Sequence, residues 1–266
     1  MADDDLDPIE RARKAVTDRA ELPGMSLMEH LTELRTRLLH AVGWVAAGVV
    51  IAYIFHTRLI GYIQKPLVDI GLKMTMTHPT DALNFIIKTS VVVGIIIASP
   101  FVLYQLWLFI SPGMYENEKK YVFPFMGATV GLFLAGVWFG YRWVLPGAMA
   151  FLIQDIGKNF THMITIEDYT QFFLSVILGL GICFELPILM FFLALFGIVD
   201  GKFFLRQWRY AILIIFLISA IICPLQDPFS MCLFASPMLA LYVVGVAVAF
   251  FVHPSSRKAR EAKKAA

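Results

Sequence analysis

The chain has 266 residues, of which 59% are apolar and only 16% are charged. A soluble globular domain is about 45–50% apolar and about 25% charged, so this composition excludes an ordinary soluble protein and predicts one that spans a membrane. The formal net charge of +2 is too small to favour nucleic-acid binding, and the basic residues do not form a single stripe.

The chain is predicted to have three parts. Residues 1–25 mix acidic and basic side chains and contain no apolar core, so we expect a disordered cytoplasmic tail and no cleavable secretory signal. Residues 26–252 are expected to form one membrane domain, and residues 253–266 a basic cytoplasmic tail.

Long apolar stretches predict an all-α fold with six transmembrane helices. A helix needs about 20 residues to cross about 30 Å of hydrocarbon, so the first four stretches are long enough or nearly so, and the fifth is short. Pro237 lies inside the sixth, where we expect it to interrupt the helix. The outer loops, about 56–84 and 146–168, could hold short interfacial helices. The predicted spans are about 38–55, 85–110, 121–145, 169–195, 210–224 and 229–252.

The orientation of the predicted spans follows from the basic residues. Most of the 22 Lys and Arg residues fall in the N-terminal segment, the loops 111–120 and 197–209, and the C-terminal tail. Cytoplasmic loops carry an excess of Lys and Arg, so both termini are predicted to be cytoplasmic.

Catalytic and metal-binding patterns are not found in the sequence. Cys183, Cys223 and Cys232 lie in apolar runs without CxxC spacing, which favours inert buried thiols over metal ligands. There is no HExxH, GxSxG or P-loop motif, and the six histidines lie in or near the flanks of the spans. We therefore expect no enzymatic activity, no metal and no cofactor.

An acidic residue is predicted at the cytoplasmic start of the first span. In segment 26–39, SLMEHLTELRTRLL, leucines recur at helical spacing and leave His30, Glu33 and Arg37 on one polar side. Glu33 and Arg37 could simply pair along the helix, which contributes about 0.2–0.5 kcal/mol. The alternative is that the carboxylate binds a partner at the membrane surface.

A second acidic residue, Glu118, lies in the loop SPGMYENEKKY, in or before the first turn of the third predicted helix. The helix dipole favours a carboxylate there by about 0.3–1 kcal/mol. A purely structural role therefore also accounts for this residue.

Glu185 lies well inside the fourth predicted span, with Pro187 just after it. An ionisable group at this depth costs about 2.5–3.5 kcal/mol, so it needs a polar partner, a wet cavity or a proton. Together with Gln105 on the second span, it indicates a cavity or a partner contact; the alternative is a protonated Glu that is hydrogen-bonded between helices. Asp227 occupies the outer turn between the last two spans, where a turn former is common.

Several motifs together resemble the TatC family, the multi-spanning receptor subunit of the twin-arginine protein translocase. They occur in the family's order from about Met28 to about Phe251 and include six spans. The motifs are MEHLTELRTRLL, SPFVLYQLWLFISPGMYENEKK, FELPI, and CPLQDPFSM followed by SPM.

The resemblance implies a function in the cell inner membrane. It implies a multi-pass receptor that binds the twin-arginine signal peptides of folded cargo at the cytoplasmic face. It also implies assembly with single-span partner subunits of the TatA and TatB type, in a hetero-complex that contains several copies of the chain. Export would be driven by the proton-motive force.

The resemblance also implies site residues. Glu33 and Glu118 match the family's signal-binding acids, and paired arginines need carboxylates in fixed places because Arg makes bidentate, charge-assisted bonds. Glu185 matches an intramembrane Glu that faces partner or signal helices. The implied signal-peptide site comprises Glu33, Glu118, Arg35, His30, Phe109 and Tyr115, the polar contacts are Glu185, Gln105 and Asp227, and the structural residues are Pro66 and Pro100.

An alternative function remains open from the residues alone. A small secondary transporter or channel could use Glu185 as its ion or proton site.

Overall fold

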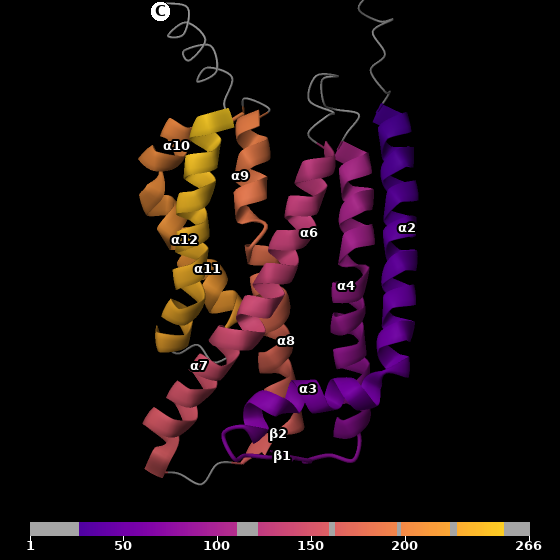
Figure 1. Cartoon of the computed structure of the whole chain (residues 1–266), viewed down its shortest axis with the longest axis vertical. Coiled ribbons are helices and arrows are strands. Elements are labelled where there is room, and N and C mark those ends of the chain that lie inside the picture. The colour runs from indigo at the N-terminus through magenta and orange to yellow at the C-terminus, as the bar shows by residue number, and fades with distance from the viewer. Residues whose placement is uncertain (1–26, 111–121, 160–162, 196–197, 224–227, 253–266) are drawn as a thin grey trace, which may run out of the picture.

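The computed structural model of the chain describes residues 27–110, 122–159, 163–195, 198–223 and 228–252. These residues are mostly helical, and long helices run side by side through the molecule (Figure 1). Within these ranges, five stretches are long and apolar enough to cross a membrane: His30–Ile54, Asp81–Phe109, Pro124–Ile153, Ile166–Leu195 and Pro228–Phe250.

The predicted fifth span corresponds to a shorter helix. Helix α11, Trp208–Ile222, is apolar but has only 15 residues, which is fewer than the about 20 that cross a bilayer unaided. It follows the short helix α10, Gly201–Arg206, and packs against α12, Pro228–Val252. The beginning of α2, Leu27–Ile54, and the end of α12 lie at the same end of the molecule (Figure 1).

The third helix is longer than expected, because it continues past residue 145 into the predicted outer loop. The amide of Leu145 donates to the carbonyl of Gly140, five residues back, so a wide π-helical turn precedes Pro146. Such a turn accommodates a proline, which has no N–H to donate, without ending the helix. The segments in order are α6 (Val122–Phe139), the π-turn η2 (Gly140–Val144), α7 (Leu145–Ala150), the π-turn η3 (Phe151–Ile156) and the 3-10 turn η4 (Gly157–Asn159).

The predicted first outer loop contains a short helix, as expected. Helix α3, His56–Val68, lies across the lower ends of the long helices (Figure 1). Strand β1, Met74–Thr75, then pairs in parallel with β2, Ile164–Thr165, from the second outer loop. Tyr169 of α8 (Ile166–Cys183) is buried, and its hydroxyl donates to the carbonyl of Ile63 over 2.6 Å, so α8 holds α3 in place.

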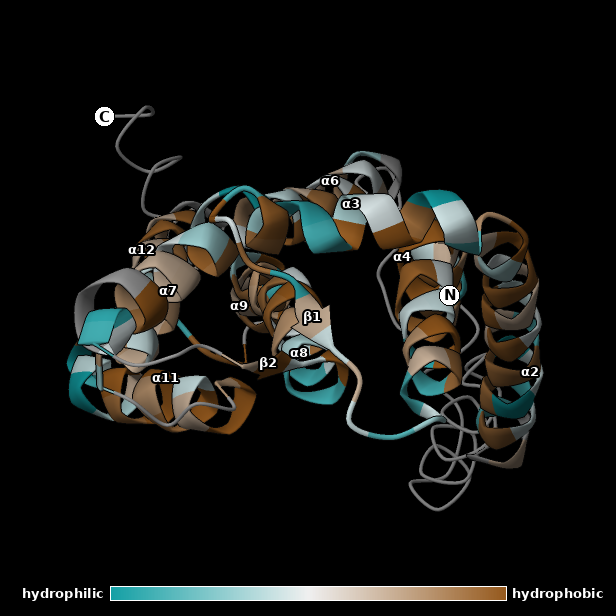
Figure 2. Ribbon diagram, turned by 90° about the horizontal axis from the view of Figure 1, so that it is seen from below, coloured by the Kyte–Doolittle hydropathy of each residue, from teal (hydrophilic) through white to brown (hydrophobic). Residues whose placement is uncertain are grey.

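Helices α2 and α4 (Asp81–Ile110) pack with their backbones in close contact. A Cβ atom added to Gly48 would lie 2.4 Å from the carbonyl oxygen of Gly94, and one added to Gly94 would lie 2.6 Å from the backbone of Val49. Small residues allow this approach, which is the usual way that helices associate in membranes. Much of the remaining surface of α2 is apolar and exposed, as its largely brown ribbon shows (Figure 2), and this suits contact with lipid.

Besides Pro146, the apolar stretches contain Pro100, Pro187 and Pro237, and these three have different effects. The fourth span breaks at Phe184 and Glu185, between α8 (Ile166–Cys183) and α9 (Leu186–Leu195), because Pro187 cannot donate to the carbonyl of Cys183. In contrast, α4 continues through Pro100 and α12 through Pro237.

The expectation that Pro237 interrupts the last helix is therefore wrong, and the serine before it supplies a reason. A helical proline leaves the carbonyl four residues back without its amide donor. The hydroxyl of Ser236 donates to that carbonyl, on Leu233, over 3.2 Å. Ser/Thr side chains are known to satisfy freed backbone groups in this way within membranes.

Candidate functional site

Glu33 and Arg37 form the ion pair that the helical spacing predicted. The Nη2 atom of Arg37 lies 3.3 Å from Oε1 of Glu33, and the Glu33 side chain is only 15% exposed. The second carboxylate oxygen, Oε2, is buried, as is Nε of Arg37, and neither has a hydrogen-bond partner among the described residues. The pair therefore retains one acceptor for a further donor.

A shallow apolar groove of about 190 Å³ lies beside this pair, between α2 and α4. Arg37 lines it, together with Gln105 and Phe109 from α4. The His30 ring stacks on the Phe109 ring with 4.5 Å between their centroids. The structure thus brings together His30, Glu33, Gln105 and Phe109 from two helices, at the end of the molecule where α2 begins.

The remaining predicted residues of this site lie elsewhere or cannot be placed. Arg35 is exposed on α2 and has no ion pair within the described part of the chain. Glu118, Tyr115 and Asp227 lie outside the described residues. Their contribution to a common site stays a prediction from the sequence.

Glu185 lies at the break between α8 and α9. Its amide donates to the carbonyl of Ile182 over 3.0 Å, and its own carbonyl accepts from Leu189 over 3.0 Å. Its Oε1 atom is buried without a hydrogen-bond partner in the described ranges, and the same holds for Oε1 of Gln105. The carboxyl group is therefore placed where another polar group, water or a proton could satisfy it.

The two proline positions lie in different surroundings. Pro66 is buried near the end of α3, where it lines a cavity that also has charged residues in its walls. Pro100 lies inside α4, where Ser99 donates to the carbonyl of Ile96 over 2.8 Å. Both lie inside helices, and the role of each as a structural residue stays a prediction.

No group of three His, Cys, Asp or Glu side chains that could hold a metal ion occurs within the described ranges. Cys183 and Cys223 are buried, as expected, but Cys232 is exposed. The apolar residues around Cys232 suggested burial, but Cys232 lies on the exposed face of α12.

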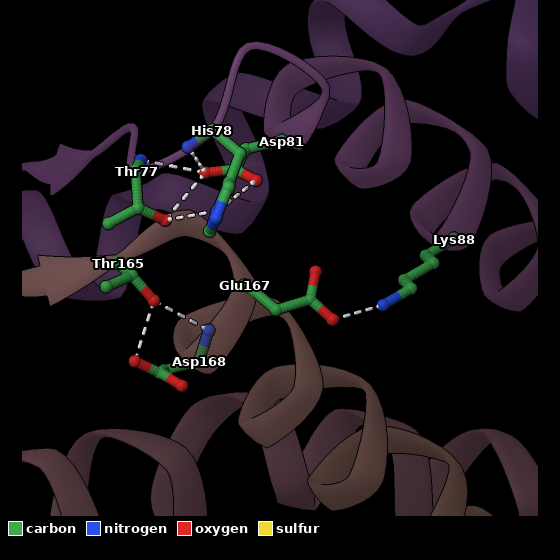
Figure 3. A network of polar contacts seen from close by, with 7 residues as sticks. All are labelled: Thr77, His78, Asp81, Lys88, Thr165, Glu167 and Asp168. Carbon is green, nitrogen blue, oxygen red and sulfur yellow. Dashed lines mark hydrogen bonds and ion pairs between the residues drawn. The ribbon is translucent and has the colours of Figure 1, made fainter.

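Sequence reasoning missed a polar network near the β1–β2 pair (Figure 3). Oδ2 of Asp81 accepts from the amides of Thr77 and His78 over 2.8 Å each, and this fixes the chain that enters α4. Lys88 of α4 forms an ion pair with Glu167 of α8. The pairing depends on how the second and fourth spans pack, and its signals in the sequence were a lysine inside the second predicted span and an acid just before the fourth.

The fold and this site define a class: a multi-pass helical membrane protein with a half-buried, incompletely paired carboxylate at one end of its helices. The family model for the Sec-independent protein translocase protein (TatC) matches residues 29–237. The chain belongs to the TatC family, whose members are components of a protein translocase.

Related sequences and a solved structure match this chain over most of its length. A TatC protein of Koribacter versatilis is 47% identical over 98% of this chain and 97% of its own length. One of Carboxydothermus hydrogenoformans is 33% identical over 86% of this chain and 95% of its own. A crystal structure described as the twin-arginine translocase receptor TatC superposes with a TM-score of 0.77 at 33% identity, and it covers 84% of this chain and 99% of the solved one.

Proposed function

We propose that this protein is the twin-arginine signal-peptide receptor and core subunit of a translocase that exports folded proteins across the cytoplasmic membrane. The observation that carries the proposal is the second carboxylate oxygen of Glu33, which is buried and lacks a partner among the described residues. A guanidinium group could bind it while Arg37 holds the other oxygen.

The groove beside Glu33 supports this recognition mode. Its lining is apolar apart from Arg37 and Gln105, so it suits the apolar residues that accompany a pair of arginines in a signal peptide. The stacked rings of His30 and Phe109 add a planar surface on which a guanidinium could stack. The proposed site also includes three residues that the sequence resemblance assigns to it: Glu118, Tyr115 and Arg35.

The proposed topology has six spans with both termini in the cytoplasm. Helix α11 is the remaining crossing, and its 15 residues would span a locally thinned bilayer or lie against protein. The Lys and Arg residues then concentrate on the cytoplasmic side. The site at Glu33 would then face the cytoplasm, where the receptor would bind signal peptides before export.

Single-span partners of the TatA and TatB type are proposed to dock along α11 and α12. Many apolar side chains of these helices are exposed, such as Leu213, Ile221 and Val243. Glu185 would offer a polar contact to a partner or signal helix inside the membrane, and Asp227 would lie at the outer end of the same edge. Export is proposed to use the proton-motive force.

The alternative function, a transporter of small solutes, lacks support, because the family is one of protein transport.

The direct test measures binding of a synthetic twin-arginine peptide to the purified chain in detergent. Glu33→Gln and Glu118→Gln together should weaken binding by at least about tenfold, since each removes a charge-assisted bond. The same peptide with Lys-Lys in place of Arg-Arg should bind the unmodified chain weakly. Glu167→Gln is the control, because it neutralises a carboxylate far from α2's beginning. Undiminished binding to the double variant, or equal binding of both peptides, would contradict the proposal.

A further inference from the structure

A cavity of about 370 Å³, with charged residues among its walls, lies between α3 and the π-helical turn of the third helix. It is separate from the groove beside Glu33 and has no place in the proposed receptor function. Its walls are Lys65, Pro66, Asp69, Ile70, Tyr141, Arg142 and Pro146.

Three charged side chains surround this cavity without neutralising one another. Lys65, Asp69 and Arg142 are all exposed, and none forms an ion pair within the described ranges. Lys65 and Asp69 are four residues apart, so they occupy one face of the same helical segment. The cavity thus offers two cations and one carboxylate to a ligand with charges of both signs.

The position of the cavity matches the headgroup layer of a bilayer. Helix α3 lies across the ends of the long helices (Figure 1). From Val122 to Arg142 the third helix rises about 30 Å, which is roughly the thickness of the hydrocarbon core. Tyr62 and Trp143 beside the cavity are 67% and 50% exposed, and exposed Tyr and Trp residues concentrate at membrane interfaces.

The cavity walls are also well fixed. Pro66 is buried, and the hydroxyl of Tyr141 donates to the carbonyl of Tyr62 over 2.9 Å, which joins α3 to the π-turn. π-Helical turns occur frequently at functional sites. Here the turn places Arg142 opposite Lys65 and Asp69.

We propose that this cavity binds the headgroup of a zwitterionic phospholipid with a primary ammonium, from the leaflet opposite the signal-peptide site. The phosphate is held by Lys65 and Arg142, and the ammonium by Asp69. A purely anionic headgroup fits less well, because the carboxylate of Asp69 repels it or remains unpaired.

The test uses native mass spectrometry of the delipidated full chain, titrated with phosphatidylethanolamine or phosphatidylglycerol of identical acyl chains. The unmodified chain should bind phosphatidylethanolamine more tightly. Asp69→Asn should remove this preference, a change of about tenfold in the ratio of the two affinities. Lys65→Gln and Arg142→Gln should weaken both lipids.

Arg58→Gln is the matched control, because Arg58 is exposed on the same helix and does not line the cavity. It should leave both affinities unchanged. Three results would overturn the proposal: an unchanged lipid preference in Asp69→Asn, equal effects of Arg58→Gln and Lys65→Gln, or soluble phosphoethanolamine binding as tightly as the lipid. The last result would assign the cavity to a small soluble zwitterion. All substitutions are at exposed positions, and gel filtration checks that each variant stays folded.

Discussion

The hydroxyl of Ser99 donates to the carbonyl oxygen of Ile96 over 2.8 Å, and Pro100 follows directly. Ile96 is the residue whose carbonyl Pro100 leaves without an amide donor. Ser236 does the same for Leu233 ahead of Pro237. The fourth span has Leu186 before its proline instead of a serine, and there the helix breaks.

Replacing Ser99 by Ala should therefore destabilise the protein. A carbonyl that loses its partner away from water costs about 1–3 kcal/mol; Ile96 is partly buried, and Ser99 is only 5% exposed. The midpoint of thermal unfolding in detergent should fall for Ser99→Ala and fall less for Ser99→Thr, which keeps the hydroxyl. Equal effects of the two variants would show that the hydroxyl does not support the helix.

Enlarging Gly94 should separate α2 from α4. A side chain there meets the backbone of Val49, and overpacking of this kind costs about 1–3 kcal/mol. Gly94→Val should lower the unfolding midpoint and also weaken peptide binding, because the proposed site needs both helices. Gly43→Ala on α2 is the control, since an added Cβ there meets nothing within 4 Å. Similar losses in both variants would argue against a specific close contact.

Removal of the Tyr169 hydroxyl should loosen α3. Tyr169→Phe leaves the carbonyl of Ile63 without this donor in a buried environment, at a cost of about 1–3 kcal/mol. Tyr141→Phe removes a more exposed hydrogen bond to Tyr62 and should cost less. Hydrogen exchange over residues 56–68 reports the change directly, and faster exchange is expected mainly in the Tyr169 variant. Unchanged protection there would contradict the anchoring role.

The ion pair between Lys88 and Glu167 should contribute little to stability. The two side chains are 45% and 42% exposed, and exposed pairs typically contribute about 0.2–1 kcal/mol. A double-mutant cycle with Lys88→Gln and Glu167→Gln, read from unfolding midpoints, should give a coupling in this range that decreases with added salt. The exchanged pair, Lys88→Glu with Glu167→Lys, should retain most of it. A coupling of several kcal/mol would mean that the pair is shielded from water.

Local features of this chain could be predicted from its sequence, whereas features that need two distant segments could not. The Glu33–Arg37 pair follows from helical spacing within one element. The stacking of His30 on Phe109 requires the packing of α2 against α4, which glycine contacts determine. The parallel β1–β2 pair joins residues far apart in the chain, so no local pattern indicated it.

The effects of the prolines also could not be predicted from local sequence. Their positions were plain, but their effects depended on a neighbouring hydroxyl at Pro237 and on a shift of hydrogen-bond register at Pro146. The predicted end of the third span at residue 145 missed the helix beyond Pro146, and the expected interruption at Pro237 is absent. The break before Pro187 was not predicted, because the predicted span 169–195 runs through it.

The continuous helix from Val122 to Ile156 has a mechanical consequence. At about 1.5 Å per residue it measures roughly 50 Å, well beyond the about 30 Å of hydrocarbon. It must therefore tilt steeply in the bilayer or extend beyond the hydrocarbon at one end.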